Sequence, residues 1–212
     1  MKKVILLAFV ALSMTAFAQH VTPLTLEITE VKIDSLRALY LAEPTMYRAS
    51  LEVVEQQLLK DGESIKAVTN ELKAEQAYAK SVEVSLKDAS TLTASLKKIY
   101  AKEESELRNM QKNIEKQSKT INRQKELNQE TRDSYVKLVE QQQSELNYAI
   151  REVAERQRAL AELDTSIQEG RTGLQAFIEE TQKKADGIAQ LEATLKERMA
   201  TIKNEQKAAK TM

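Results

Sequence analysis

The amino-acid sequence predicts an all-α protein of long coiled-coil helices, with an antiparallel helical hairpin that bends near residues 118–134 as the favoured arrangement. Two observations lead to this fold class. The 212 residues include only four Gly, two Pro and three Phe, with no Trp, and no Pro follows Pro44. Apolar residues also recur every seven positions in two long blocks. A chain with so few large side chains cannot fill a thick core, so it must bury narrow stripes on long helices.

The N-terminus has the features of a secretory signal peptide. A short positive stretch, Met1–Lys3, precedes an apolar run that ends near Phe17, and small residues close it. We expect cleavage between Ala18 and Gln19, which makes residues 1–18 a removed signal. The alternative is a membrane anchor, but the run of about 15 apolar residues is shorter than the ~20 that a spanning helix needs. The mature chain is therefore expected to be exported, periplasmic or secreted, with no transmembrane segment.

Residues 19–44 predict a small N-terminal cap. Leu24, Leu26 and Ile28 alternate with other residues, which is typical of an extended segment. Asp34 is the expected N-cap of a short helix that follows. Pro44 either ends that helix or starts the next one, because proline is tolerated only in the first turn of a helix.

The first coiled-coil arm, residues 45–121, carries a seam of apolar residues at strict heptad spacing. Acidic residues interrupt the companion positions three residues further on, at Asp61, Glu75 and Glu103, so the apolar stripe is narrow. We expect a kink, not a break, at Gly62. The seam comprises Leu51, Leu58, Ile65, Leu72, Leu86, Leu107, Ile114 and Ile121.

The second arm, residues 139–203, has its own heptad series, and the two series are out of phase by four residues. Gly170 and Gly173 again predict a kink within an unbroken heptad spacing. A polar connector, 122–138, separates the arms, and residues 204–212 are expected to form a frayed tail. The second seam comprises Val139, Leu146, Val153, Leu160, Ile167, Leu174, Ile188, Leu195 and Ile202.

The phase change has two interpretations. Near-equal arms on either side of a polar segment favour a hairpin with arms of ~105 Å. The polar segment lacks Gly and Pro, however, so one continuous coiled-coil rod of ~250 Å is the alternative. A rod must oligomerise, because a lone helix cannot bury its apolar stripe. Self-association, or a helical protein partner, is thus expected.

Cys and His, two residue types common in catalytic sites, are nearly absent. The chain has no Cys, and His20, beside the expected mature N-terminus, is the one histidine, which leaves no basis for a hydrolytic triad or a thiolate site. We expect no enzyme, no cofactor and no metal. Lys plus Arg and Asp plus Glu are equal at 32 each, so nothing in the overall charge suggests a nucleic-acid partner.

One surface feature stands out. Five cations step by three or four residues and therefore share one helical face. The favoured interpretation is a solvated face whose charges pair with acidic residues at coiled-coil edges. The alternative is a face that contacts anionic envelope components or an acidic partner. The set, called the basic stripe below, comprises Arg108, Lys112, Lys116, Lys119 and Arg123.

A signal peptide, a small apolar N-terminal segment and long charged helices resemble the outline of periplasmic chaperones of the Skp/OmpH type. That resemblance implies a holdase that keeps outer-membrane proteins between helical tentacles. The family returns to a strand after its hairpin, whereas this chain ends in the Lys-rich Lys203–Met212. We therefore expect a structural or interaction protein, a spacer, tether or scaffold of the bacterial cell envelope, with a periplasmic holdase as the alternative.

Overall fold

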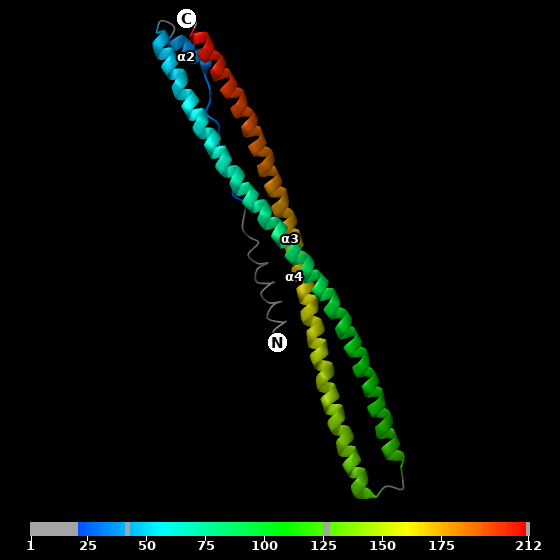
Figure 1. Cartoon of the computed structure of the whole chain (residues 1–212). Helices are drawn as coiled ribbons and strands as arrows, with labels where there is room; N and C mark the ends of the chain where they lie inside the picture. The colour runs from blue at the N-terminus through cyan, green and yellow to red at the C-terminus, as the bar shows by residue number, and fades with distance from the viewer. Residues whose placement is uncertain (1–20, 41–42, 125–127, 211–212) are drawn as a thin grey trace. The chain divides into compact units, whose positions relative to one another are not determined.

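The protein is an all-α helical hairpin. The computed structural model describes residues 21–40, 43–124 and 128–210. They form a short helix, α2 (Ile33–Tyr40), and two long ones, α3 (Pro44–Arg123) and α4 (Gln129–Ala209), which run in opposite directions (Figure 1). No strand occurs among these residues. The expected signal peptide, its Ala18–Gln19 cleavage site and His20 lie outside the described residues.

The chain divides into two compact units. The cap-proximal unit contains the described residues of 18–83 together with 173–212, and the turn-proximal unit contains the described residues of 84–172. In each unit, a stretch of α3 lies beside an antiparallel stretch of α4 (Figure 1). The cap-proximal unit has an additional layer, residues 21–40, called the cap segment below.

Polar side chains shape the turn between α3 and α4. The Asn128 side chain accepts a 2.8 Å hydrogen bond from the Thr131 amide, which satisfies one of the free N–H groups at the start of α4. Arg132 donates a 2.8 Å hydrogen bond to the carbonyl of Gln124 at the end of α3. Asn128 therefore caps α4, and the two helices extend from both sides into the expected connector 122–138.

Both long helices run without a break through the glycines that predicted kinks. No residue with positive φ occurs in the described parts of the chain. At Gly62, an added Cβ would lie 3.3 Å from Leu195 Cδ2, so this glycine lets α4 approach closely within the cap-proximal unit. The space around Gly173 is open.

The cap segment packs on the long helices. Residues 21–32 form an extended stretch, and α2 follows. The Leu36 amide donates to the Lys32 carbonyl, and α2 begins at Ile33, so Asp34 lies in the first turn and is not the N-cap we expected. The negative charge of Asp34 still interacts favourably with the positive end of the helix dipole. Ile28 joins a core cluster with seam residues of both long helices.

The C-terminus is held and does not fray over residues 204–209. Helix α4 continues to Ala209, which is 1% exposed. Arg48 Nε donates a 2.7 Å hydrogen bond to the Ala209 carbonyl, and Gln206 donates to Glu55 at 2.8 Å. Arg37 forms a bidentate hydrogen-bonded ion pair with Glu205. These partners lie far away in sequence, which is why local composition did not reveal them.

Candidate functional site

The seam residues fall into two groups by burial. Most are buried, and they lie at the centre of the helix pairing. The buried ones are Leu51, Leu58, Ile65, Leu72, Leu86, Leu146, Val153, Leu160, Ile167, Leu174, Ile188 and Ile202. The half-buried ones are Leu107, Ile114, Ile121, Val139 and Leu195.

Four of the five half-buried seam residues lie near the turn, where packing is thin. Among the described residues of 94–145, no side chain is buried. Large apolar side chains are exposed there as well, with Met110 at 54% and Leu138 at 50%. This part of the turn-proximal unit therefore keeps apolar surface in contact with water.

Polar pairs close one flank of this unit. We number the seam residues as position a of each heptad. The residues of this closed flank then occupy position e. Lys97 on α3 forms an ion pair with Asp164 on α4. One heptad further on, Gln157 donates a 3.0 Å hydrogen bond to Glu104. That bond, and then the contact with Arg108, lower the pKa of the Glu104 carboxyl. Antiparallel helices bring equivalent e positions together in this way.

The other flank, formed by positions d and g, is open toward the turn, whereas Ala89 and Leu163, both at position d, are buried. Arg156 bridges it at one level, 3.7 Å from Glu103 and with its guanidinium 5.9 Å from the centroid of the Tyr100 ring. Beyond that level, toward the turn, lies a groove of about 400 Å³. Its lining residues are Leu107, Met110, Asn113, Ile114, Gln117, Gln142, Glu145, Leu146 and Ala149.

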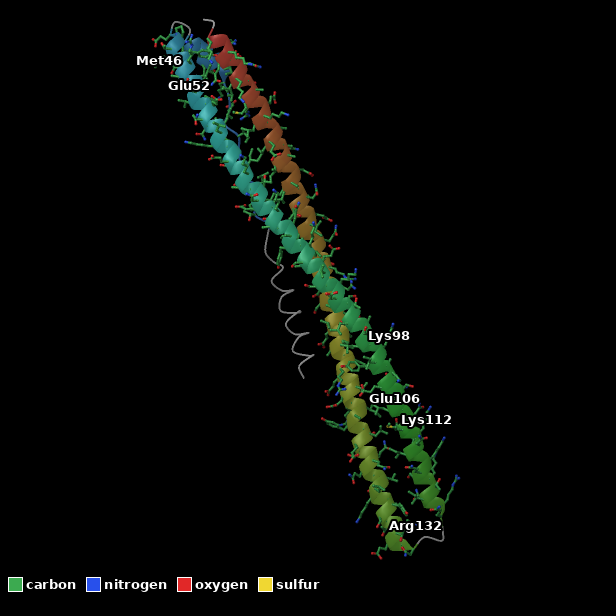
Figure 2. The ribbon with its side chains drawn as sticks, in the orientation of Figure 1. Met46, Glu52, Lys98, Glu106, Lys112 and Arg132 are labelled. Carbon is green, nitrogen blue, oxygen red and sulfur yellow. The ribbon has the colours of Figure 1, made fainter. Side chains whose placement is uncertain are left out.

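The basic stripe lies on a third surface. All five of its residues are exposed, and they occupy heptad positions b, c and f, which face away from the seam. Figure 2 shows Lys98 and Lys112 on the side of α3 that points away from α4. Arg108 pairs with Glu104 at 2.5 Å, one turn back on the same helix. In the described part of the chain, the other four cations form no ion pair, so edge pairing within the hairpin does not account for them.

Metal-binding clusters and membrane-spanning helices are two features that the described residues lack. These residues contain no cluster of three or more His, Cys, Asp or Glu side chains arranged to hold a metal ion. Within the same ranges, no helix combines the length and the apolar character required to span a membrane. The chain matches no protein-family model, and the searches found no similar curated protein or solved structure.

The acidic residues that interrupt the first seam have a role that sequence reasoning missed. Asp61 accepts a 2.8 Å hydrogen bond from the Thr29 amide. Glu75 accepts from Thr22 at 3.4 Å and forms an ion pair of 2.9 Å with the buried Lys184. Their shared heptad position, d, was the available signal: an acidic residue repeated on one flank implies a polar layer packed against it.

Proposed function

We propose that this chain is a non-enzymatic interaction protein of the bacterial cell envelope, a spacer or tether that contacts a phosphate-bearing surface through its basic stripe. The observation that carries this proposal is the exposure of the stripe. The hairpin uses its seam and its closed flank to hold itself together, and in the described part of the chain four of the five cations of this face of α3 form no ion pair.

The charge pattern supports an anionic ligand. Over residues 107–123 of α3, the stripe is opposed by Glu115 alone. A row of cations on one helical face attracts anionic headgroups by ~1 kcal/mol for each Lys or Arg near the surface. The predicted export of the chain places such headgroups, anionic phospholipid or lipopolysaccharide phosphate, within its reach. No covalent chemistry is required for this role.

The test is charge reversal at Lys112, Lys116 and Lys119. Because each lysine contributes ~1 kcal/mol, the triple change to Glu should weaken binding to anionic phospholipid vesicles by about 100-fold or more. Binding of the unmodified protein should also fall as salt rises, since exposed charges are screened. Vesicle co-sedimentation measures both effects, and vesicles that carry lipopolysaccharide distinguish the two phosphate sources.

A matched control uses three other exposed lysines of α3, Lys66, Lys73 and Lys80, changed to Glu. This variant has the same net charge as the first but an intact stripe, so it should bind vesicles several times more tightly than the stripe variant does. Equal binding by the two variants would show that net charge alone matters. Absence of binding by the unmodified protein would remove the phosphate-surface proposal altogether.

A holdase is the second candidate function, and the groove is the observation that favours it. Apolar surface exposed along the open flank is typical of a site that binds other polypeptides. A holdase suppresses the aggregation of unfolded clients, whereas a tether does not. Light scattering from a heat-denatured client, with and without this protein, separates the two.

A further inference from the structure

In the cap-proximal unit the cap segment covers one flank of the helix pair, whereas near the turn no other described segment covers it. In the cap-proximal unit, the cap segment lies on heptad positions d and g of α3 and α4. Its polar contacts all reach position d, at Asp61, Glu75, Arg198 and Glu205. In the turn-proximal unit, positions d and g line the groove. The cap segment is therefore an example, within the same molecule, of a segment that fits this flank.

That example is an extended polypeptide held by its backbone. The amides of Thr22 and Thr29 donate to Glu75 and Asp61, and Arg198 donates to the carbonyls of Ile28 and Thr29 at 2.5 Å each. From Glu75 to Asp61, α3 rises by ~21 Å. An extended chain from Thr22 to Thr29 spans ~23 Å. The agreement shows that the segment lies stretched along α3.

Apolar side chains complete this contact. Val21 and Ile28 are each 9% exposed. Leu24 packs so tightly on α4 that a Cβ at Gly187 would lie 2.6 Å from its Cδ2 atom. The covering segment thus combines alternating apolar side chains, which pack on the helices, with backbone groups that hydrogen-bond to side chains at position d.

The groove offers the same two elements. Its apolar lining comprises Leu107, Met110, Ile114, Leu146 and Ala149. Its polar lining is mostly amide, with Asn113, Gln117 and Gln142, and Glu145 is the one charged lining residue. In the described part of the chain, these three amide side chains make no hydrogen bond. An amide can donate to a carbonyl and accept from an N–H, which are the groups that an extended backbone presents.

We propose that the groove binds an extended apolar segment of a partner polypeptide, in the manner of the cap segment on the neighbouring stretch of the same helices. The lining of α3 runs from Leu107 to Gln117, a rise of ~15 Å, which matches four or five extended residues. The proposal goes beyond the tethering role, because the groove and the basic stripe lie on different heptad positions. Uncharged amides and one carboxylate do not suit an anion, so phosphate is not the ligand here.

The test measures binding of a fluorescein-labelled peptide with the sequence of residues 21–30, VTPLTLEITE, to the purified protein by fluorescence anisotropy. Met110→Asp places a charge on the apolar lining, and Ala149→Trp fills the groove. Both should weaken binding at least tenfold. Val84→Asp is the matched control, because Val84 is 58% exposed at position f of the same unit, and it should bind as the unmodified protein does. Circular dichroism establishes that each variant keeps its helicity.

Several results would overturn the proposal. One is the absence of peptide binding at millimolar concentration; another is binding that neither groove variant changes. A dimer in sedimentation velocity that Met110→Asp dissociates, without peptide binding, would make a second copy of the chain the occupant. The charge-reversed variant at Lys112, Lys116 and Lys119 separates this proposal from the tethering role. It should lose vesicle binding and keep the peptide.

Discussion

In the cap-proximal unit, a third segment covers one flank of α3 and α4, whereas the same heptad positions in the turn-proximal unit line an open groove. Seam burial differs along the hairpin as well. Leu51, Leu58 and Ile202 are fully buried, while Ile114 and Ile121 stay half-exposed. Leu86, Val153 and Ile167 of the turn-proximal unit are also buried, so thin packing is confined to the described residues of 94–145. Most of the groove lining belongs to that stretch.

Truncation of matched seam residues should show the largest difference between the units. Leu58→Ala removes a fully buried side chain and should lower the free energy of unfolding by about 3 kcal/mol or more, through lost burial and a residual cavity. Ile114→Ala removes a half-exposed side chain and should cost about 1 kcal/mol. Urea unfolding followed by circular dichroism measures both. Equal costs would contradict the thin packing near the turn.

Two ion pairs, one in each unit, should show a difference of intermediate size in their contribution to stability. The Lys184 side chain is 3% exposed beside Glu75, whereas Lys97 and Asp164 are 49% and 42% exposed. Lys184→Ala should cost about 3 kcal/mol, because it leaves a partly buried carboxylate unpaired. Lys97→Ala should cost below about 1 kcal/mol. The double variant Glu75→Leu with Lys184→Met removes both charges and should recover most of this lost stability. If it does not, the burial of an unpaired charge is not the cause of the loss.

The smallest expected effect is a loss of stability at alkaline pH. Burial, and then the 2.9 Å hydrogen bond to Glu205, raise the pKa of Tyr47. The unfolded chain loses this proton near pH 10, while the folded chain keeps it, so stability falls as pH rises from about 10. Tyr47→Phe should flatten this fall in thermal unfolding scans at several pH values.

Tyr148 provides the comparison for that experiment. Its pKa is also raised, by a hydrogen bond to Glu152 on the same helix, but its side chain is 66% exposed in the turn-proximal unit. Tyr148→Phe should leave the alkaline profile unchanged. A flattening of similar size in both variants would show that local helix contacts, and not the part-buried contact between α3 and α4, set the dependence on pH.

The helices themselves could be predicted from the sequence. Heptad spacing, Pro44 and the polar segment before residue 139 are local signals, and they indicated all-α arms and a turn. The position of the cap could not be predicted, because its partners are separated from it by up to 170 residues. Arg198 and Glu205 look like ordinary surface charges in the sequence. The groove was equally hidden, since an unpaired glutamine at position d resembles any solvated one.

The basic stripe was visible in the sequence because cations three and four residues apart share a face in any helix. Its outward direction follows from the predicted seam too, because Leu107, Ile114 and Ile121 place the five cations at heptad positions b, c and f. The acidic residues at position d were misinterpreted. They were interpreted as defects of a seam, although Asp61 and Glu75 are the acceptors that fix the cap.

The distance along the chain between the cap and its partners also orders the folding process. Helix pairing near the turn joins residues that are close in sequence, whereas Arg37 meets Glu205 across 168 residues. The contacts of the cap with Asp61 and Glu75 can form once α3 is available, whereas those with Arg198 and Glu205 form only when α4 is nearly complete. A docked cap that holds all four contacts therefore joins an early and a late part of the folding process.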